Sequence, residues 1–154
     1  MSESGLKHRL QEDMKTALKA KDKERLGTVR LILAAIKQRE IDERISLDDE
    51  AVLVVLDKAA KQRRESIQQY SAAHRQDLVE QEQTELAIIE SYLPEKLDEA
   101  TLQTLVREAI SLSGAATVKD MGKVMAILKP QVQGRVDMTQ LGATVKELLN
   151  QSSN

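Results

Sequence analysis

Cysteine, phenylalanine and tryptophan are absent from this chain of 154 residues, which contains only two prolines and six glycines. Without cysteine there is no disulfide, no thiolate metal site and no thiol nucleophile, and nothing indicates an oxidising compartment. The prolines and glycines are too few for the frequent turns of an all-β sandwich or barrel. Because the apolar residues are almost all aliphatic, the composition favours helices around a core without large aromatic side chains.

Long hydrophobic runs are also missing. No window approaches the roughly 18 consecutive apolar residues of a membrane span, and the first five residues lack the basic and apolar parts of a signal peptide. We therefore expect a soluble chain with a cytoplasmic location and no membrane partner. The net charge is −2, with 16 basic against 18 acidic residues up to Leu93 and 7 against 7 from Pro94 onward. Neither half is globally basic, so a nucleic-acid surface would have to be local.

Apolar residues recur every three or four positions almost throughout, which is the spacing of amphipathic helices. Four helices are expected before Pro94, at about 6–21, 22–43, 46–73 and 78–93, with Ser46 and Asp49 as a capping box for the third. The fourth stops at Pro94, because a proline pushes the preceding residue out of the α region.

Three shorter helices are expected after Pro94. The first starts at Asp98 and stops at Gly114, the second has Thr117 as its cap and stops before Pro130, and the third is capped by Asp137. The sequence thus predicts an all-α fold with an N-terminal helical domain of about four helices, residues 1–93, and a small three-helix tail bundle, residues 94–154.

No catalytic or metal-binding constellation is recognisable. His8 and His74 lie far apart, and neither belongs to a spacing such as H-E-x-x-H that would place two ligands on one helix face. Gly122 and Lys123 are followed by Val124, so the hydroxyl of a phosphate-binding loop is missing. We therefore expect no metal, no cofactor and no catalytic residue.

A local basic surface in the tail is the feature that remains. Between positions 119 and 135 four cations face only Asp120, for a local charge of +3. A glycine inside a helix costs about 1 kcal/mol relative to alanine, so Gly122 indicates close approach of a ligand or, equally well, a helix contact within the bundle. Arg135 is expected beside a helix N-terminus, where donors for a phosphate cluster. The candidate RNA-binding residues are Lys119, Gly122, Lys123, Lys129, Gly134 and Arg135.

A second basic stripe recurs every seven residues along the predicted second helix, at Lys23, Arg30, Lys37 and Arg44. It would extend for roughly 30 Å and could follow a phosphate backbone. The nearby Glu40, Asp42 and Glu43 favour the alternative that this is an ordinary solvated helix face.

Arg63 falls on the inward stripe of the third helix, where an arginine needs an acidic partner or a functional reason.

Seven sequence blocks, in this order, resemble the GatB/YqeY family along essentially the whole chain. They are residues 19–22, Leu26 with Arg30, and residues 61–67, 75–78, 92–94, 121–125 and 134–137. The resemblance is to stand-alone YqeY-like proteins and implies a helical domain followed by a small helical tail domain. The same module looks like the C-terminal part of the B subunit of the tRNA-dependent amidotransferase, where it holds tRNA. One departure is His74, at a helix-to-helix turn where the family pattern has glycine.

The resemblance therefore implies a non-catalytic module that binds tRNA or structured RNA. The family label of a carbon-nitrogen ligase with glutamine as amido donor belongs to the larger enzyme, whose catalytic parts have no counterpart here. A helical adaptor that docks onto another protein through the N-terminal helices is the first alternative. An accessory role in an amidotransferase complex is the second, and activity of the chain alone is the least favoured.

Overall fold

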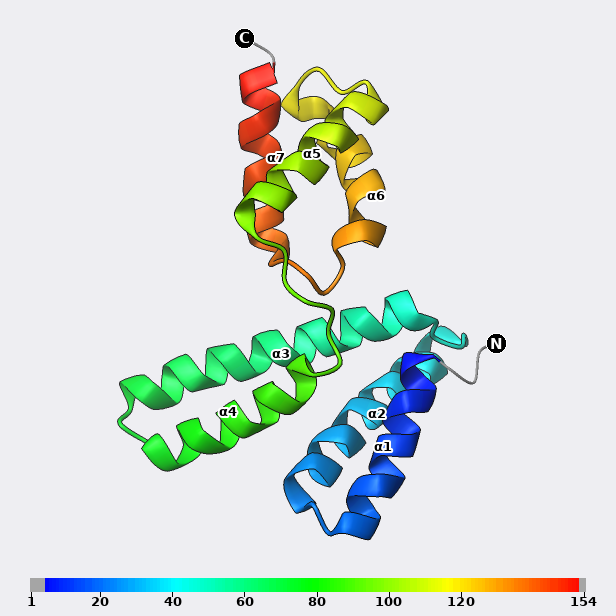
Figure 1. The fold of residues 1–154 in the computed structure, drawn as a ribbon, viewed down its shortest axis with the longest axis vertical. Helices are drawn as coiled ribbons and strands as arrows, with labels where there is room; N and C mark the ends of the chain where they lie inside the picture. Colours follow the sequence, from blue (N-terminus) through cyan, green and yellow to red (C-terminus); the bar gives the residue numbers. More distant parts are fainter. Residues whose placement is uncertain (1–4, 153–154) are drawn as a thin grey trace. The chain divides into compact units, whose positions relative to one another are not determined.

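The computed structural model describes residues 5–152, and within that range it contains seven α-helices, one short 3₁₀ helix and no strand (Figure 1). The predicted all-α class is confirmed. The chain divides into two compact units, Met1–Pro94 and Glu95–Asn154. No helix within the described residues has the length and apolar character that a membrane span requires.

The first unit consists of two helical hairpins. Its helices are α1 (Leu6–Ala20), α2 (Lys23–Glu43), α3 (Asp49–Ala72) and α4 (Gln76–Glu90). α1 packs on α2 and α3 packs on α4, while α2 also contacts both helices of the second hairpin (Figure 1). The core between them is aliphatic, with Leu10, Val29, Leu56 and Ile89 fully buried.

Aspartate side chains cap two of the four helices of this unit. Asp22 caps α2 by accepting a hydrogen bond from the backbone N–H of Arg25 at 3.1 Å. α3 is capped by Asp48, so the predicted start at Ser46 is wrong. The reason is Leu47, which is buried and whose N–H donates to Glu40 Oε2 at 2.8 Å, so the chain stays extended until Asp48. α4 ends at Glu90, one turn before the predicted stop at Pro94.

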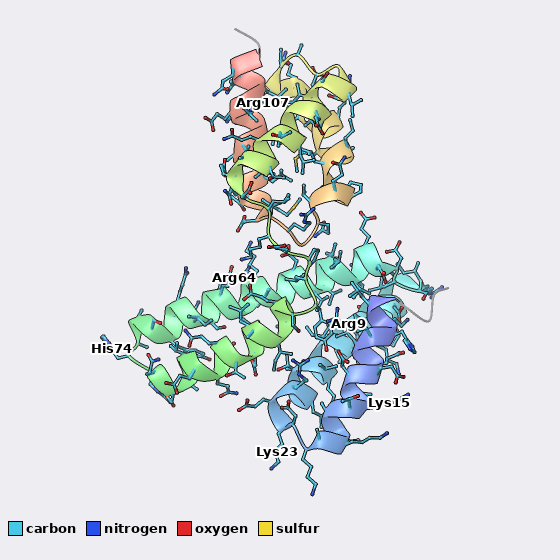
Figure 2. The ribbon with its side chains drawn as sticks, in the orientation of Figure 1. Arg9, Lys15, Lys23, Arg64, His74 and Arg107 are labelled. Atoms are coloured by element: carbon cyan, nitrogen blue, oxygen red, sulfur yellow. The ribbon has the colours of Figure 1, made fainter. Side chains whose placement is uncertain are left out.

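At the ends of three helices in the first unit, a residue other than glycine adopts the left-handed backbone conformation. Lys21, Arg44 and His74 have φ angles of 59°, 56° and 58°. His74 lies at the tip of the α3–α4 hairpin, and Figure 2 shows its side chain at the end farthest from α2. The turn therefore keeps the positive φ that a glycine would adopt more easily, and the two helices remain sharply separated.

The second unit is a three-helix bundle of α5 (Glu99–Ser113), α6 (Met121–Val132) and α7 (Met138–Ser152), with the 3₁₀ helix η1 (Val118–Asp120) leading into α6. Val106, Leu128 and Leu141 are among its fully buried residues. The predicted stop before Pro130 is wrong, because α6 continues to Val132. Val132 is fully buried, so packing holds a last turn that the proline disfavours.

Candidate nucleic-acid interface

Three lysines project from the exposed side of η1 and α6. Lys119, Lys123 and Lys129 are all exposed. Within the described residues Lys119 and Lys129 form no ion pair, and the Lys123 Nζ lies 3.9 Å from Asp120 Oδ1 with 70% of its side chain exposed. The three ammonium groups are therefore available to an external anion. We call Lys119, Lys123 and Lys129 the lysine patch.

Gly122 lies within this patch and leaves its surface open. A Cβ added at Gly122 would meet no atom within 4 Å, so the alternative of a helix contact within the bundle is wrong. Lys129 is seven residues later, which places it on nearly the same side of α6 about 10 Å along the axis. Ala126, between them, is also exposed. This side of α6 therefore carries little side-chain bulk between Gly122 and Lys129.

Asp120 is the acidic group closest to the lysine patch. Its Oδ2 accepts hydrogen bonds from the backbone N–H groups of Ala116, at 3.0 Å, and Thr117, at 3.4 Å. These two bonds lower the pKa of the Asp120 carboxyl below its ordinary value. The carboxylate is thus held by backbone amides at the start of η1, and the patch keeps a net positive charge.

Gly134 and Arg135 lie at the other end of α6 and are bound into the fold. Gly134 is buried with φ 77° in the turn to α7. The Arg135 Nε donates to the carbonyl oxygen of Glu95 at 3.1 Å, and the Arg135 carbonyl accepts from the Leu97 N–H at 2.9 Å. These contacts fasten the start of the second unit to the α6–α7 turn.

Two backbone donors at the N-terminus of α7 are already bonded within the chain. Asp137 Oδ1 accepts hydrogen bonds from the N–H groups of Thr139, at 2.8 Å, and Gln140, at 3.3 Å. These two donors, which were expected to attract a phosphate, thus already have a partner within the chain.

The second basic stripe lies on one edge of α2, where Lys23, Arg30, Lys37 and Arg44 are all exposed. Lys23 lies at the tip of the α1–α2 hairpin (Figure 2).

The acids near this stripe are bonded to other residues. Glu40 is paired with Lys7 at 2.7 Å, and Asp42 accepts from the Gln38 side chain at 2.9 Å. Glu43 is paired with Arg39. The bonds to Lys7 and to the Leu47 N–H lower the pKa of Glu40. The stripe cations are therefore not neutralised by the acids that the sequence places beside them.

Arg63 has the acidic partners that its inward position requires. Its Nε donates to Glu85 Oε2 at 3.0 Å and lies 3.6 Å from Glu82 Oε2, and all three side chains are largely buried. Glu82 Oε2 is buried without a hydrogen bond. Burial, together with the charge of Glu85, raises the pKa of Glu82. The cluster joins α3 to α4, and we assign it to the fold.

No group of three or more histidine, aspartate or glutamate side chains within residues 5–152 is arranged to hold a metal ion.

Comparison with known proteins gives a family and named relatives. A family model described as "Yqey-like protein" matches residues 7–149. "Altered inheritance of mitochondria protein 41, mitochondrial" of Kluyveromyces lactis is 34% identical over 139 residues, which cover 89% of this chain and 72% of that protein. The protein of the same name from Pyrenophora tritici-repentis is 32% identical over 145 residues, covering 92% and 79%. Both names are those of mitochondrial proteins, and this contradicts the cytoplasmic location expected from the sequence.

Proposed function

Since the chain belongs to the YqeY-like protein family, we propose from that premise that it is a non-catalytic module that binds tRNA or another structured RNA. The observation that carries the proposal is the lysine patch, in which three exposed ammonium groups surround an open helix surface. The only acid in this segment is Asp120, whose carboxylate is engaged by backbone amides. The resemblance to the tRNA-holding part of an amidotransferase subunit supports the same choice of ligand.

Binding at this surface would be electrostatic. A lysine acts as a point charge toward a phosphate, and each phosphate neutralised releases condensed counterions. Gly122 and Ala126 present no bulk between Lys123 and Lys129, so a sugar-phosphate backbone can approach the helix closely. Such contacts position a nucleic acid by its shape and carry little sequence information.

The aromatic residues give no support for single-strand recognition by base stacking. The chain has two tyrosines and neither phenylalanine nor tryptophan. Tyr92 is buried, and its hydroxyl is bonded to Asp13 at 2.6 Å. Tyr70 is half-buried. Since stacking platforms need exposed aromatic faces, the favoured ligand is a folded RNA with a continuous backbone.

The test is binding of the purified chain to bulk tRNA over a salt series, with a short duplex RNA of equal charge density as competitor. The proposal predicts saturable binding that prefers tRNA and weakens with salt. If the duplex displaces bound tRNA from the protein as effectively as unlabelled tRNA does, the interaction is non-specific electrostatic binding and the proposal is wrong.

A second function, docking onto another protein, is favoured by a separate observation in the first unit. An open groove there follows α2 between the two hairpins.

A further inference from the structure

Helix α2 carries apolar side chains on two opposite sides. On one side Val29 and Ile36 are buried in the core of the first unit. On the other side Leu31 is 55% exposed and Ile41 is 60% exposed, with the exposed Ala34 between them. An apolar side of a helix is normally buried against another element. The second side of α2 is therefore a surface without a partner in the described part of the chain.

An open groove runs beside this exposed side. One part, of about 1050 Å³, lies between the first half of α2 and α4, and the other, of about 700 Å³, lies between the second half of α2 and α3. Leu31 lines both parts. Together they follow α2 from Lys23 to Glu43, a length of about 30 Å. A helix of about five turns, roughly 27 Å long, fits within this length.

Gly27 adds an independent observation inside the groove. It is in the second turn of α2 and lines the part against α4. A Cβ at this position would meet no atom within 4 Å, so the packing of the unit does not require a glycine there. A glycine in a helix is less favourable than alanine, and it is suited to a place where another backbone approaches closely.

In the part of the groove between α2 and α4, the two sides have opposite net charges. Lys23, Glu24 and Arg30 line this part from α2 and give it a net positive charge, and within residues 5–152 neither Lys23 nor Arg30 forms an ion pair. Asp77, Glu80 and Glu85 line it from α4. Asp77 is paired with Arg75 and Glu85 with Arg63, whereas Glu80 is exposed and forms no ion pair within the described residues.

The row of cations on α2 continues past the part of the groove that faces α4. Lys37 and Arg44 extend the row of exposed cations along the same edge of α2, so the basic stripe borders the exposed apolar side over its whole length.

From these observations we propose that the groove between α2 and α4 binds an amphipathic helix of a protein partner. Its apolar face covers Leu31 and Gly27, its acidic flank faces the α2 side of the groove, and its basic flank faces Glu80. This mode of recognition places an apolar helix face in an apolar groove and uses flanking charges to set the orientation. RNA does not fit this site, because the acidic α4 side would repel its phosphates. The groove lies in the first unit and uses no residue of the lysine patch.

The test uses the full chain and a fluorescein-labelled designed helical peptide of about 18 residues. Its leucines recur every three or four positions, with glutamates on one flank and lysines on the other. A second peptide of the same composition has the glutamates and lysines exchanged. Anisotropy titrations should give a Kd below about 100 µM for the peptide whose charges match the two sides of the groove, and binding of the exchanged peptide at least about tenfold weaker.

Three variants locate the site. Leu31→Glu should weaken binding of the matched peptide by at least about tenfold, because it places a charge in the apolar contact. Glu80→Lys should shift the preference toward the exchanged peptide. Leu112→Glu, which changes an apolar residue 78% exposed on α5, should leave both affinities unchanged. Circular dichroism of each variant confirms that it is folded.

Equal affinities for the two peptides, or no saturable binding of either, would overturn the proposal. Sedimentation velocity decides whether the occupant is instead a second copy of this chain. A dimer in the wild type that Leu31→Glu dissociates would assign the groove to self-association and would also overturn the proposal. The RNA experiment on the lysine patch is unaffected by either result, so the two proposals fail separately.

Discussion

The hydroxyl of Tyr92 donates a 2.6 Å hydrogen bond to Asp13 Oδ2, and this bond joins the segment after α4 to the middle of α1. Tyr92 is buried, and the guanidinium of Arg9 lies 4.7 Å from the centre of its ring. Tyr92 also precedes Pro94, where the first unit ends. The bond therefore fixes the last residues of this unit against its first helix.

Tyr92→Phe should lower the free energy of unfolding by about 2 kcal/mol, because it removes a hydrogen bond to a charged group that is part-buried. Burial, followed by the bond to Asp13, raises the pKa of Tyr92 from 10.0 to about 12. A raised pKa favours the protonated hydroxyl in the folded chain, so this stabilisation is present below pH 10 and is lost as the pH rises toward 12.

Urea unfolding of the two proteins between pH 7 and pH 11.5 checks both statements. The difference between wild type and Tyr92→Phe should shrink at the alkaline end. A difference that stays constant with pH would show that the hydroxyl does not have the raised pKa.

Arg63→Met should destabilise the first unit by about 3 kcal/mol, because it leaves Glu82 and Glu85 as two unpaired and largely buried carboxylates. Chemical denaturation at pH 7 measures the loss. Lys61→Met, an exposed basic residue on the same helix, is the matched control and should change stability far less. Equal effects of the two substitutions would mean that the cluster does not hold α3 against α4.

His74→Gly should raise stability by about 1 kcal/mol, because a residue with a Cβ pays that cost in the left-handed region and glycine does not. Ala73→Gly is the control. Ala73 has φ −87°, so glycine gains nothing there and adds freedom to the unfolded chain. Thermal unfolding should therefore move in opposite directions for the two variants, and a loss of stability in His74→Gly would contradict the role assigned to this turn.

Arg135→Gln and Lys123→Gln should separate a structural from a binding role in the second unit. The first removes the Nε bond to the Glu95 carbonyl and should cost about 1 kcal/mol. Hydrogen exchange at the Leu97 amide, which donates to the Arg135 carbonyl, should become faster. Lys123→Gln should leave this exchange rate unchanged and weaken tRNA binding. The reverse pattern would move the RNA contact from the lysine patch to the α6–α7 turn.

The helical periodicity predicts most of the fold, because each unit buries a continuous aliphatic side of every helix. The predicted helix ends are wrong where tertiary contacts set them. Leu47 is buried ahead of α3 and delays its start to Asp48, and buried Val132 keeps α6 helical beyond Pro130. The need for an acidic partner of Arg63 is predictable, but its identity as Glu85 depends on the packing of α3 against α4.

The candidate sites are predictable only in part. The three lysines follow from sequence, whereas the structural bonds of Arg135 and the capped N-terminus of α7 involve contacts that the spacing of residues does not reveal. The groove is not predictable from the sequence, because its walls depend on how α2 packs against α3 and α4.

The central claim is that the lysine patch binds RNA phosphates, and the salt dependence of tRNA affinity tests it most directly. The measurement compares wild type with the triple variant Lys119→Gln, Lys123→Gln and Lys129→Gln. The control carries Arg107→Gln and Lys146→Gln, two exposed cations of the same unit outside the patch.

The plot of log affinity against log salt should lose about 2 to 3 units of slope in the triple variant, at about 0.7 to 0.9 per phosphate contact, and the control should keep the slope of the wild type. An unchanged slope in the triple variant, or an equal loss in the control, would contradict the claim.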